Sequence, residues 1–234
     1  MRISEAKVII TGGTTGIGYE TAKLLKAQGA QVVICARNED SVNKIATELD
    51  VYGIRADVTN EEDITNLFSY AIEKMNGLNI LINNAGIGHS GSLLSTSVSD
   101  FALIWENNTK SVFMCGQKAA KIFIEQNYGN IINISSMGAV NGFPNGSAYC
   151  SSKSAITGLT LSWRSELRKH NIRVTQVNPS EVVTGFGEKS GHVTTAPENK
   201  LKGLEIAQVI NSLLSLNDIA FVPEINVWAT NPGS

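Results

Sequence analysis

The chain has 234 residues, of which 42% are hydrophobic and 17% are charged, and its formal net charge at pH 7 is −2. This composition is typical of a soluble globular protein, and no apolar run approaches the ~18 residues that a membrane-spanning helix needs. Because there is no excess of positive charge and no block of Lys and Arg, the sequence argues against nucleic-acid binding. The length suits a single α/β domain, which we expect to span residues 1–234.

Apolar runs rich in Val and Ile alternate with segments of helical length along the whole chain. Strands are predicted at residues 7–11, 31–36, 51–58, 78–83, 130–135 and 172–178, and a last one at 225–229. Helices are predicted at residues 17–28, 39–49, 61–75, 99–126, 147–169 and 204–216. The first six strands are nearly continuous in apolar residues, which is typical of strands covered on both faces in a parallel sheet. The pattern predicts a doubly wound parallel sheet with helices on both faces and ligands beyond the carboxyl ends of its strands.

Cysteine and histidine positions argue against a metal site. Cys35, Cys115 and Cys150 are isolated and lack metal-type spacing, so each is interpreted as a small reduced core residue. The three histidines are scattered, and none pairs with a nearby cysteine. The first residues lack the charged region, apolar stretch and cleavage site of a secretion signal, which predicts a cytoplasmic protein.

The first predicted strand ends in a glycine-rich turn, TGGTTGIG, which supplies Gly12, Gly16 and Gly18. Glycines at such a turn let the backbone bend sharply and approach a pyrophosphate, whose charge meets the positive end of the helix dipole. A glycine-rich loop alone could be only a tight turn. Its position after the first strand of a βα series favours dinucleotide binding.

The segment AYCSSK places Tyr149 and Lys153 four residues apart, so the two side chains share one face of a predicted helix. Taken alone, the pair fits an ordinary solvated helix surface as well as an acid and the group that sets its pKa. A free tyrosine has a pKa of about 10, so acid-base catalysis near neutrality requires something that stabilises its phenolate. The ammonium group of Lys153 can supply that stabilisation.

Four motifs occur in order along the chain: TGGTTGIG at 11–18, NNAG at 83–86, NISS at 133–136 and YCSSK at 149–153. Together they resemble the short-chain dehydrogenase/reductase family over nearly the whole chain through Thr184, and the chain is similar to the 3-oxoacyl-carrier-protein reductases and related carbonyl reductases. The resemblance implies a Rossmann-like domain that transfers hydride between a nicotinamide cofactor and a carbonyl or alcohol. A non-catalytic NADP-binding sensor or scaffold protein is the alternative that the sequence leaves open.

The resemblance places the family's active-site residues on Asn108, Ser136, Tyr149 and Lys153. Tyr149 then exchanges a proton with the substrate oxygen, and Ser136 holds that oxygen through a hydrogen bond. The family spacing favours Ser136 over the neighbouring Ser135, and Asn108 over the asparagine before it.

The resemblance also implies a set of cofactor contacts. They are Gly12, Thr14, Gly16, Ile17, Gly18, Arg37, Asp57, Val58, Asn83, Ala85, Gly86, Tyr149, Lys153, Pro179, Val182 and Thr184. Among them, Asp57 matches an aspartate that contacts the adenine amino group, although an ordinary acid before a helix fits this position as well. Ser180 stands where relatives usually have glycine, and a Cβ at that turn weakens the assignment of Val182 and Thr184.

The end of the second predicted strand, ICARNED, favours NADP(H) as the cofactor. NAD-preferring relatives usually place an acid there, where it accepts hydrogen bonds from the ribose hydroxyls and repels a 2′-phosphate. This chain has Ala36 at that position, and the guanidinium of Arg37, which follows, can pair with the phosphate. The alternative, that Arg37 is only a solvent-exposed loop residue, stays open.

Residues 184–203 are polar and rich in glycine, and they are predicted to form a mobile segment that covers the substrate.

His89 is interpreted as a surface-loop residue rather than a substrate contact, and Cys150 as a packing residue. The expected partner is a small carbonyl or alcohol molecule. Because family members commonly assemble through their long helices, we expect a homotetramer or a homodimer.

Overall fold

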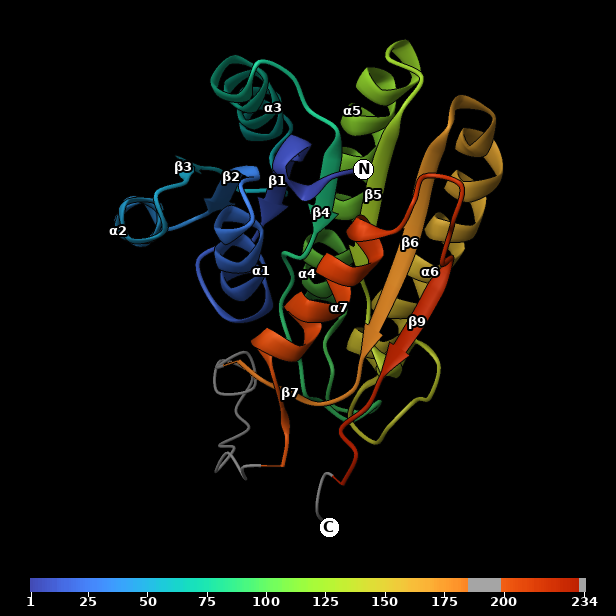
Figure 1. Cartoon of the computed structure of the whole chain (residues 1–234). Helices are drawn as coiled ribbons and strands as arrows, with labels where there is room; N and C mark the ends of the chain where they lie inside the picture. The colour runs from blue at the N-terminus through green and yellow to red at the C-terminus, as the bar shows by residue number, and fades with distance from the viewer. Residues whose placement is uncertain (185–198, 232–234) are drawn as a thin grey trace.

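The computed structural model describes residues 1–184 and 199–231. Within these residues seven parallel strands form one sheet in the order β3-β2-β1-β4-β5-β6-β9 (Figure 1). The strands are β1 (Lys7–Thr11), β2 (Gln31–Ala36), β3 (Tyr52–Arg55), β4 (Ile80–Asn83), β5 (Gly129–Ile134), β6 (Ile172–Pro179) and β9 (Glu224–Val227). The strand order reverses between β1 and β4, which places the expected ligand crevice outside the carboxyl ends of these two strands.

Helices cover both faces of the sheet. One face carries α1 (Gly16–Ala27), α2 (Glu39–Leu49) and α7 (Gly203–Ser215), and the other carries α3 (Glu61–Met75), α4 (Val98–Trp105), α5 (Ser111–Glu125) and α6 (Ser147–Leu167) (Figure 1). Each face has its own apolar core because alternate residues of a strand point to opposite sides. In β1, Ile9 packs in the core that includes α3, α5 and α6, whereas Val8 and Ile10 pack in the core that includes α1 and α7. The predicted doubly wound, Rossmann-like α/β fold is confirmed.

Local sequence signals explain where α2 and α3 begin. The Asn38 side chain accepts a hydrogen bond from Ser41 N at the start of α2, and the Asn60 side chain accepts from the amides of Glu62 and Asp63 at the start of α3. Acidic residues fill the first turn of both helices, where their charge interacts favourably with the helix dipole. The first amides of α2 and α3 are therefore hydrogen-bonded to the side chains that cap these helices.

The third strand differs from its prediction. It ends at Arg55 rather than at residue 58, and it forms an edge of the sheet with Tyr52 exposed. The expectation that it is covered on both faces is therefore wrong, since none of its residues is buried. The apolar run continues past the strand because Ala56 and Val58 pack against the core beside α3 after the strand has ended.

The helix predicted over residues 99–126 consists of three consecutive pieces, which are α4, the π-helical segment η2 (Glu106–Lys110) and α5. Asn107, Asn108 and Thr109 of η2 are buried, and their side chains hydrogen-bond to backbone carbonyls or to a hydroxyl. Polar side chains of this kind compete with regular helical hydrogen bonding. Single π turns inside helices are frequent at functional sites.

The sequence does not predict a second, two-stranded sheet. In it, β7 (Val182–Val183) pairs in parallel with β8 (Leu201–Lys202), and Lys200 Nζ lies 2.8 Å from Glu181 Oε2. These contacts join the two ends of the segment 184–203, of which residues 185–198 lie outside the described residues. The mobility and the covering role expected of this segment stay a prediction.

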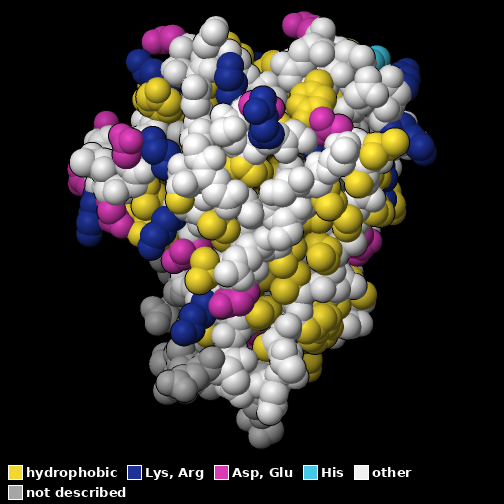
Figure 2. Space-filling model, in the orientation of Figure 1, with side chains coloured by type: hydrophobic (Ala, Val, Ile, Leu, Met, Phe, Trp, Pro, Cys, Tyr) yellow, Lys and Arg dark blue, Asp and Glu magenta, His cyan; other side chains and the backbone are white. Residues whose placement is uncertain are grey.

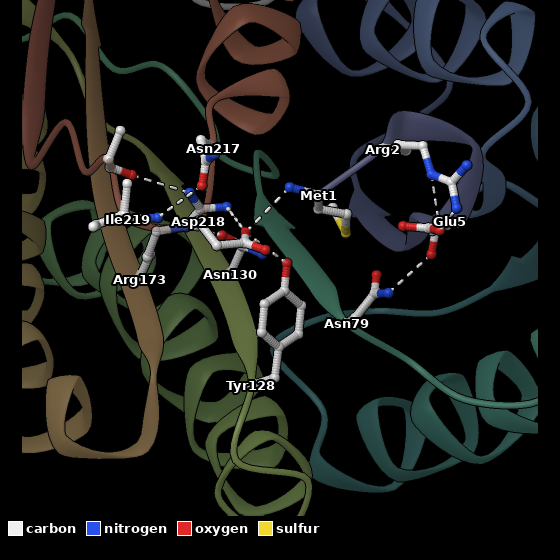
Figure 3. A network of polar contacts seen from close by, with 11 residues as sticks. Met1, Arg2, Glu5, Asn79, Tyr128, Asn130, Arg173, Asn217, Asp218 and Ile219 are labelled. Carbon is white, nitrogen blue, oxygen red and sulfur yellow. Dashed lines mark hydrogen bonds and ion pairs between the residues drawn. The ribbon is translucent and has the colours of Figure 1, made fainter.

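At the amino ends of the strands, a polar network centres on Asp218 in the connection between α7 and β9. Asp218 Oδ1 lies 3.2 Å from the amine of Met1, 3.2 Å from Tyr128 Oη and 3.4 Å from Arg173 Nη2 (Figure 3). Arg173 Nε also donates a hydrogen bond to Asn130 Oδ1 at 2.7 Å. The network ties the first residue to β5, β6 and the α7–β9 connection.

Residues 1–184 and 199–231 contain no helix with the length and apolar character to cross a membrane. In the same ranges, no three His, Cys, Asp or Glu side chains are grouped so that they could hold a metal ion. Cys35 and Cys115 are buried in the core, and burial raises the pKa of Cys35 to about 12, so this thiol stays protonated at neutral pH. Cys150 is only half-buried, so the core position expected for it is wrong.

Candidate active site

Most predicted site residues lie where the parallel strands end or in the helices that follow, at the edge of the sheet where β1, β4, β5 and β6 end (Figure 1). The glycine turn follows β1, the NNAG segment begins at the end of β4, Ser136 follows β5, and Tyr149 and Lys153 lie near the start of α6. Because neighbouring strands are parallel, their carboxyl ends bring segments that are far apart in sequence to one edge of the sheet.

Ser136 and Tyr149 form the centre of this site. Ser136 caps the short helix η3 (Met137–Ala139), where its Oγ accepts a hydrogen bond from Gly138 N at 3.0 Å. Burial raises the pKa of Tyr149 above its usual value, and a hydrogen bond between the Tyr149 and Ser136 side chains offsets part of that rise. The phenol is therefore protonated at neutral pH, which is the form that can protonate an alkoxide.

The two neighbouring serines have different surroundings. The hydroxyl of Ser135 is buried and donates to the Lys153 carbonyl at 3.0 Å, so it ties the end of β5 to α6. Ser136 is half-buried beside Tyr149. This geometry supports Ser136 as the hydroxyl that binds the substrate oxygen and leaves Ser135 to hold α6 in place.

Lys153 is 4% exposed, and its Nζ donates a hydrogen bond to the Ile134 carbonyl at 3.1 Å. The same Nζ lies 5.9 Å from the centre of the Tyr149 ring. Burial lowers the pKa of Lys153 to about 8, so the ammonium keeps most of its charge at pH 7. The net pKa of Tyr149 lies above its usual value, so the stabilisation of its phenolate by Lys153 beside an oxidised nicotinamide stays a prediction.

Asn108 lies in η2, and its side chain connects two parts of the site. Its Oδ1 accepts a hydrogen bond from Ile87 N at 2.8 Å, and its Nδ2 donates to the Ile87 carbonyl at 3.0 Å and to Ser152 Oγ at 3.1 Å. Ser152 Oγ donates in turn to the Tyr149 carbonyl at 2.7 Å. Asn108 thus links the chain after β4 to the turn of α6 that carries Tyr149, whereas the side chain of Asn107 bonds within its own helix.

The glycine turn has the sharp bend and close backbone packing that are expected of a pyrophosphate-binding turn. Gly12 and Gly16 have φ angles of +66° and +56°, which residues with a side chain rarely adopt. A Cβ on Gly16 would lie 2.7 Å from Thr184 Cβ, and a Cβ on Gly18 would collide with the Gly12 carbonyl. In the described part of the chain, the Thr15 side chain makes no capping hydrogen bond, and the first turn of α1 holds no acidic residue. The amides that begin α1 are therefore available to an anion, unlike those of α2 and α3.

The motif analysis misses Asn84. Its Nδ2 donates to the carbonyls of Thr11 and Gly12 at 2.9 and 3.0 Å, which fixes the glycine turn from the side of β4. The side chain of Asn83 is buried, and its Nδ2 donates to Asn133 Oδ1 at 2.9 Å inside the sheet. Only the main chain of Asn83 is therefore placed for the expected cofactor contact. Successive side chains of a strand point to opposite faces, and this alternation is the sequence signal that distinguishes Asn83 from Asn84.

Gly86 and Ala85 lie between the glycine turn and the centre of the site. A Cβ on Gly86 would lie 3.0 Å from Asn108 Oδ1 and 3.6 Å from Lys153 Nζ. Ala85 N donates to Thr11 Oγ1 at 3.0 Å. The NNAG segment therefore connects the expected pyrophosphate position to Lys153.

Asp57 and Arg37 lie beyond the ends of β3 and β2. Asp57 Oδ1 accepts hydrogen bonds from Thr59 N at 3.0 Å and from Thr59 Oγ1 at 2.8 Å. Burial raises the pKa of Asp57, but these hydrogen bonds and the charges of Arg37 and Arg55 outweigh it, so the net pKa lies below the usual value. Arg37 is exposed, so a cation is available beside an ionised carboxylate at the expected adenosine end of the site.

Pro179 ends β6 and is buried, whereas the remaining predicted cofactor residues are half-buried. These residues are Thr14, Ile17, Val58 and Val182.

Ser180 is not among the residues with positive φ, and its amide donates to the Val227 carbonyl at 2.8 Å, so its Cβ fits where relatives usually have glycine. His89 is half-buried, and its Nε2 lies 3.4 Å from Thr96 Oγ1.

Comparison with known proteins identifies the class of protein. The family model described as short chain dehydrogenase matches residues 6–193. The chain is 34% identical to secoisolariciresinol dehydrogenase from Forsythia intermedia, with 83% of this chain and 72% of that one covered. It is also 34% identical to 3alpha-hydroxysteroid dehydrogenase from Mediterraneibacter gnavus (strain ATCC 29149 / DSM 114966 / JCM 6515 / VPI C7-9), with 87% and 82% covered.

Solved structures agree with the fold. An alcohol dehydrogenase from the archaeon Thermococcus sibiricus, complexed with 5-hydroxy-NADP, has a TM-score of 0.88 at 26% identity, with 95% of this chain and 96% of that one covered. Levodione reductase has a TM-score of 0.88 at 26% identity, with 96% of each chain covered. The protein therefore belongs to the short-chain dehydrogenase/reductase family of oxidoreductases, which use nicotinamide cofactors. The resemblance drawn from the four motifs is confirmed.

Proposed function

We propose that this protein is an NADP(H)-dependent oxidoreductase that transfers hydride between the nicotinamide and a carbonyl or alcohol substrate, in the manner of the 3-oxoacyl reductases. When bound, the cofactor would supply or accept the hydride. The observation that carries the proposal is the hydrogen-bonded pair of Ser136 and Tyr149, with the buried ammonium of Lys153 5.9 Å from the phenol ring. The alternative of a non-catalytic sensor has no need of this arrangement.

The residues of the chain would manage the substrate oxygen and its proton. Because the Ser136 oxygen accepts a hydrogen bond from Gly138 N, its own proton can be donated to the substrate oxygen. In reduction, the protonated phenol of Tyr149 gives its proton to the nascent alkoxide. In oxidation, the phenolate takes the proton of the alcohol, with the ammonium of Lys153 beside the ring.

The proposed preference for NADP(H) rests on Arg37. β2 ends at Ala36, so no carboxylate stands there to repel a 2′-phosphate, and the exposed guanidinium of Arg37 follows immediately. The Thermococcus sibiricus relative is complexed with an NADP derivative, which supports the same preference. A hydrogen bond to a charged group is worth roughly 1.5 to 3 kcal/mol, which corresponds to about ten- to a hundredfold in affinity.

The test compares kcat/KM for NADPH and NADH over a panel of ketones, oxoacyl thioesters, sugars and hydroxy acids. The wild-type protein should prefer NADPH by about tenfold or more, and replacing Ala36 by Asp together with Arg37 by Ile should reverse that preference. Arg168→Ile is the matched control because Arg168 is an exposed arginine in η4 (Arg168–His170). Equal values for the two cofactors would contradict the role of Arg37. Binding of NADPH without reduction of any carbonyl would favour the sensor.

The proposed substrate is a small carbonyl or alcohol molecule, in keeping with relatives that are named as dehydrogenases and reductases. The location in the cytoplasm that the sequence suggests stays a prediction. Assembly into a homodimer or homotetramer also stays a prediction.

A further inference from the structure

Phe143 is an aromatic residue to which the sequence analysis gives no role. It lies in the loop between η3 and α6, and its ring centre is 6.2 Å from that of Tyr149, with 42° between the ring planes. A Cβ on Gly138 would lie 3.1 Å from Phe143 Cε1, 3.3 Å from Ser136 Oγ and 3.4 Å from Tyr149 Cε1. The Phe143 ring therefore lies directly beside the two side chains proposed to hold the substrate oxygen.

Two glycines make room for this ring. A Cβ on Gly146 would lie 2.6 and 2.8 Å from the ring atoms Cε2 and Cδ2 of Phe143, and a Cβ on Gly138 would touch the ring from the side of η3. Hydrogen bonds fix the loop: Gly146 N donates to the Phe143 carbonyl at 3.1 Å, and Gly91 N donates to the Asn145 carbonyl at 3.0 Å. The second bond joins the loop after β5 to the loop after β4, so the backbone that carries Phe143 is held in place.

Phe143 is nevertheless 49% exposed. Phe123, by contrast, is completely buried in the core, and Val140 of the same loop as Phe143 is 53% exposed. An apolar ring that is held in place but left uncovered gains free energy when another apolar surface displaces water from it. Beside the expected position of the reacting oxygen, a bound substrate can displace this water.

We propose that Phe143 determines substrate specificity, and that its open face binds a flat apolar group, aromatic or fused to a ring, next to the reacting carbonyl carbon. This inference rests on the proposed function, whose substrate class it specifies. Aromatic rings attract each other in offset-stacked or tilted arrangements with ring centres about 4.5 to 7 Å apart. A polyol placed against the same face would lose hydration without gaining hydrogen-bond partners. The proposed substrates are therefore hydrophobic cyclic or aryl ketones and the corresponding alcohols, rather than sugars or small hydroxy acids.

The kinetic test compares 2-tetralone with cyclohexanone, which share a cyclic ketone and differ by a fused aromatic ring. With NADPH, wild-type kcat/KM should be about tenfold or more higher for 2-tetralone. Phe143→Ala and the milder Phe143→Leu should remove most of this advantage, because they raise the KM for 2-tetralone by a much larger factor than the KM for cyclohexanone. Phe221→Leu is the matched control, since Phe221 is 40% exposed but packs against Arg164 instead of the site.

A binding measurement separates this inference from the proposed function. With NADP⁺ present, titration calorimetry should show that 2-naphthol, an unreactive flat probe, binds about tenfold more weakly to the Phe143→Ala variant than to the wild type. If neither ketone is reduced while naphthol binding depends on Phe143, the aromatic subsite stands and the proposed function fails. If the wild type reduces both ketones equally, or the Phe143 variants weaken both equally, the inference fails and the proposed function stands. A smaller molar mass of these variants by light scattering, with substrate preference unchanged, would overturn the inference by placing Phe143 in a contact between copies of the chain.

Discussion

Burial shifts the pKa values of Tyr149 and Lys153 in opposite directions. Loss of water disfavours the charged form of each group, so the pKa of the Tyr149 phenol rises, and the pKa of the Lys153 ammonium falls to about 8. The neutral phenol is the form needed for a proton donor in carbonyl reduction. At residue scale, the neutral phenol of Tyr149 and the charged ammonium of Lys153 suit the reductive direction of the proposed reaction.

Removing the phenol hydroxyl tests this assignment. Tyr149→Phe should lower turnover by about 10² to 10⁴, which is the usual contribution of general acid catalysis, while NADPH binding stays nearly unchanged. Tyr70→Phe on α3 is the control for loss of a tyrosine hydroxyl outside the site. Steady-state kinetics and NADPH fluorescence titration give the two readouts. A Tyr149→Phe protein that keeps more than about a tenth of wild-type turnover, with chemistry limiting the rate, would contradict the role of Tyr149.

The pKa of Lys153 gives a prediction about stability and pH. Between pH of about 8 and the unfolded-state pKa of about 10.4, the unfolded chain binds a proton at this lysine that the folded chain does not, so this contribution to the free energy of unfolding rises with pH. Relative to Lys153→Met, the wild type should therefore gain roughly 3 kcal/mol of stability across this window. Urea unfolding of both proteins from pH 7.5 to 10.5 measures the difference. A difference that stays constant with pH would show that burial does not penalise the ammonium.

At the scale of elements, the turn between β1 and α1 depends on the absence of side chains. Gly16→Ala would combine a left-handed φ of +56° with a Cβ 2.7 Å from that of Thr184. We expect a loss of about 1 to 3 kcal/mol in the free energy of unfolding and weaker NADPH binding, because Thr184 must move away from the turn. Gly142→Ala is the control, since its Cβ would meet no described atom within 4 Å. Urea unfolding and NADPH titration provide the readouts, and unchanged cofactor binding in Gly16→Ala would show that the turn does not hold the pyrophosphate.

The sequence predicts most elements because most apolar runs, although not that of β3, coincide with one buried strand, and residues such as Asn38 and Asn60 cap the helices that they precede. It cannot predict η2, because the polar contacts of Asn108 that accompany the π turn reach Ser152, which is distant in sequence. Which way the side chains of the NNAG segment point depends on where β4 ends, a detail that the motif alone does not contain. The position of Phe143 beside Tyr149 cannot be predicted from the sequence for a similar reason, since it depends on loop contacts rather than on a motif.

At the scale of the whole molecule, hydrophobic side chains remain exposed on both sides of the sheet. Figure 2 shows them gathered on one face over β6 and β9, where half-buried Ile225 and Val227 pack beside the core of α1 and α7. On the other side, Phe113 of α5 and Leu161 of α6 are exposed. Exposed apolar patches commonly mark contacts between proteins, and Phe113 and Leu161 lie on the two long helices of the predicted assembly.

Light scattering at micromolar concentration tests this assembly. The wild type should be a homodimer or homotetramer, and Leu161→Glu should shift it toward a smaller species, because a charge would be buried in the contact between helices. Ile219→Glu is the control, since Ile219 is exposed in the connection between α7 and β9 and lies outside the predicted contact. A monomeric wild type would contradict the prediction, and an unchanged mass for Leu161→Glu would exclude this face of α6.

The pairing of β7 with β8 also bears on how the substrate range of this enzyme can change over evolution. Val182 and Leu201 lie side by side, so the two ends of residues 185–198 are held together by contacts outside that segment. Doubling the length of a connection between two fixed ends costs only about 0.6 kcal/mol in closure entropy. The sheet β7–β8 can therefore stay in place when a connection of different length or composition replaces residues 185–198, and Ser136, Tyr149 and the glycine turn lie on other elements. On the prediction that residues 184–203 cover the substrate, evolution could change the substrate range of this protein and leave its cofactor site intact.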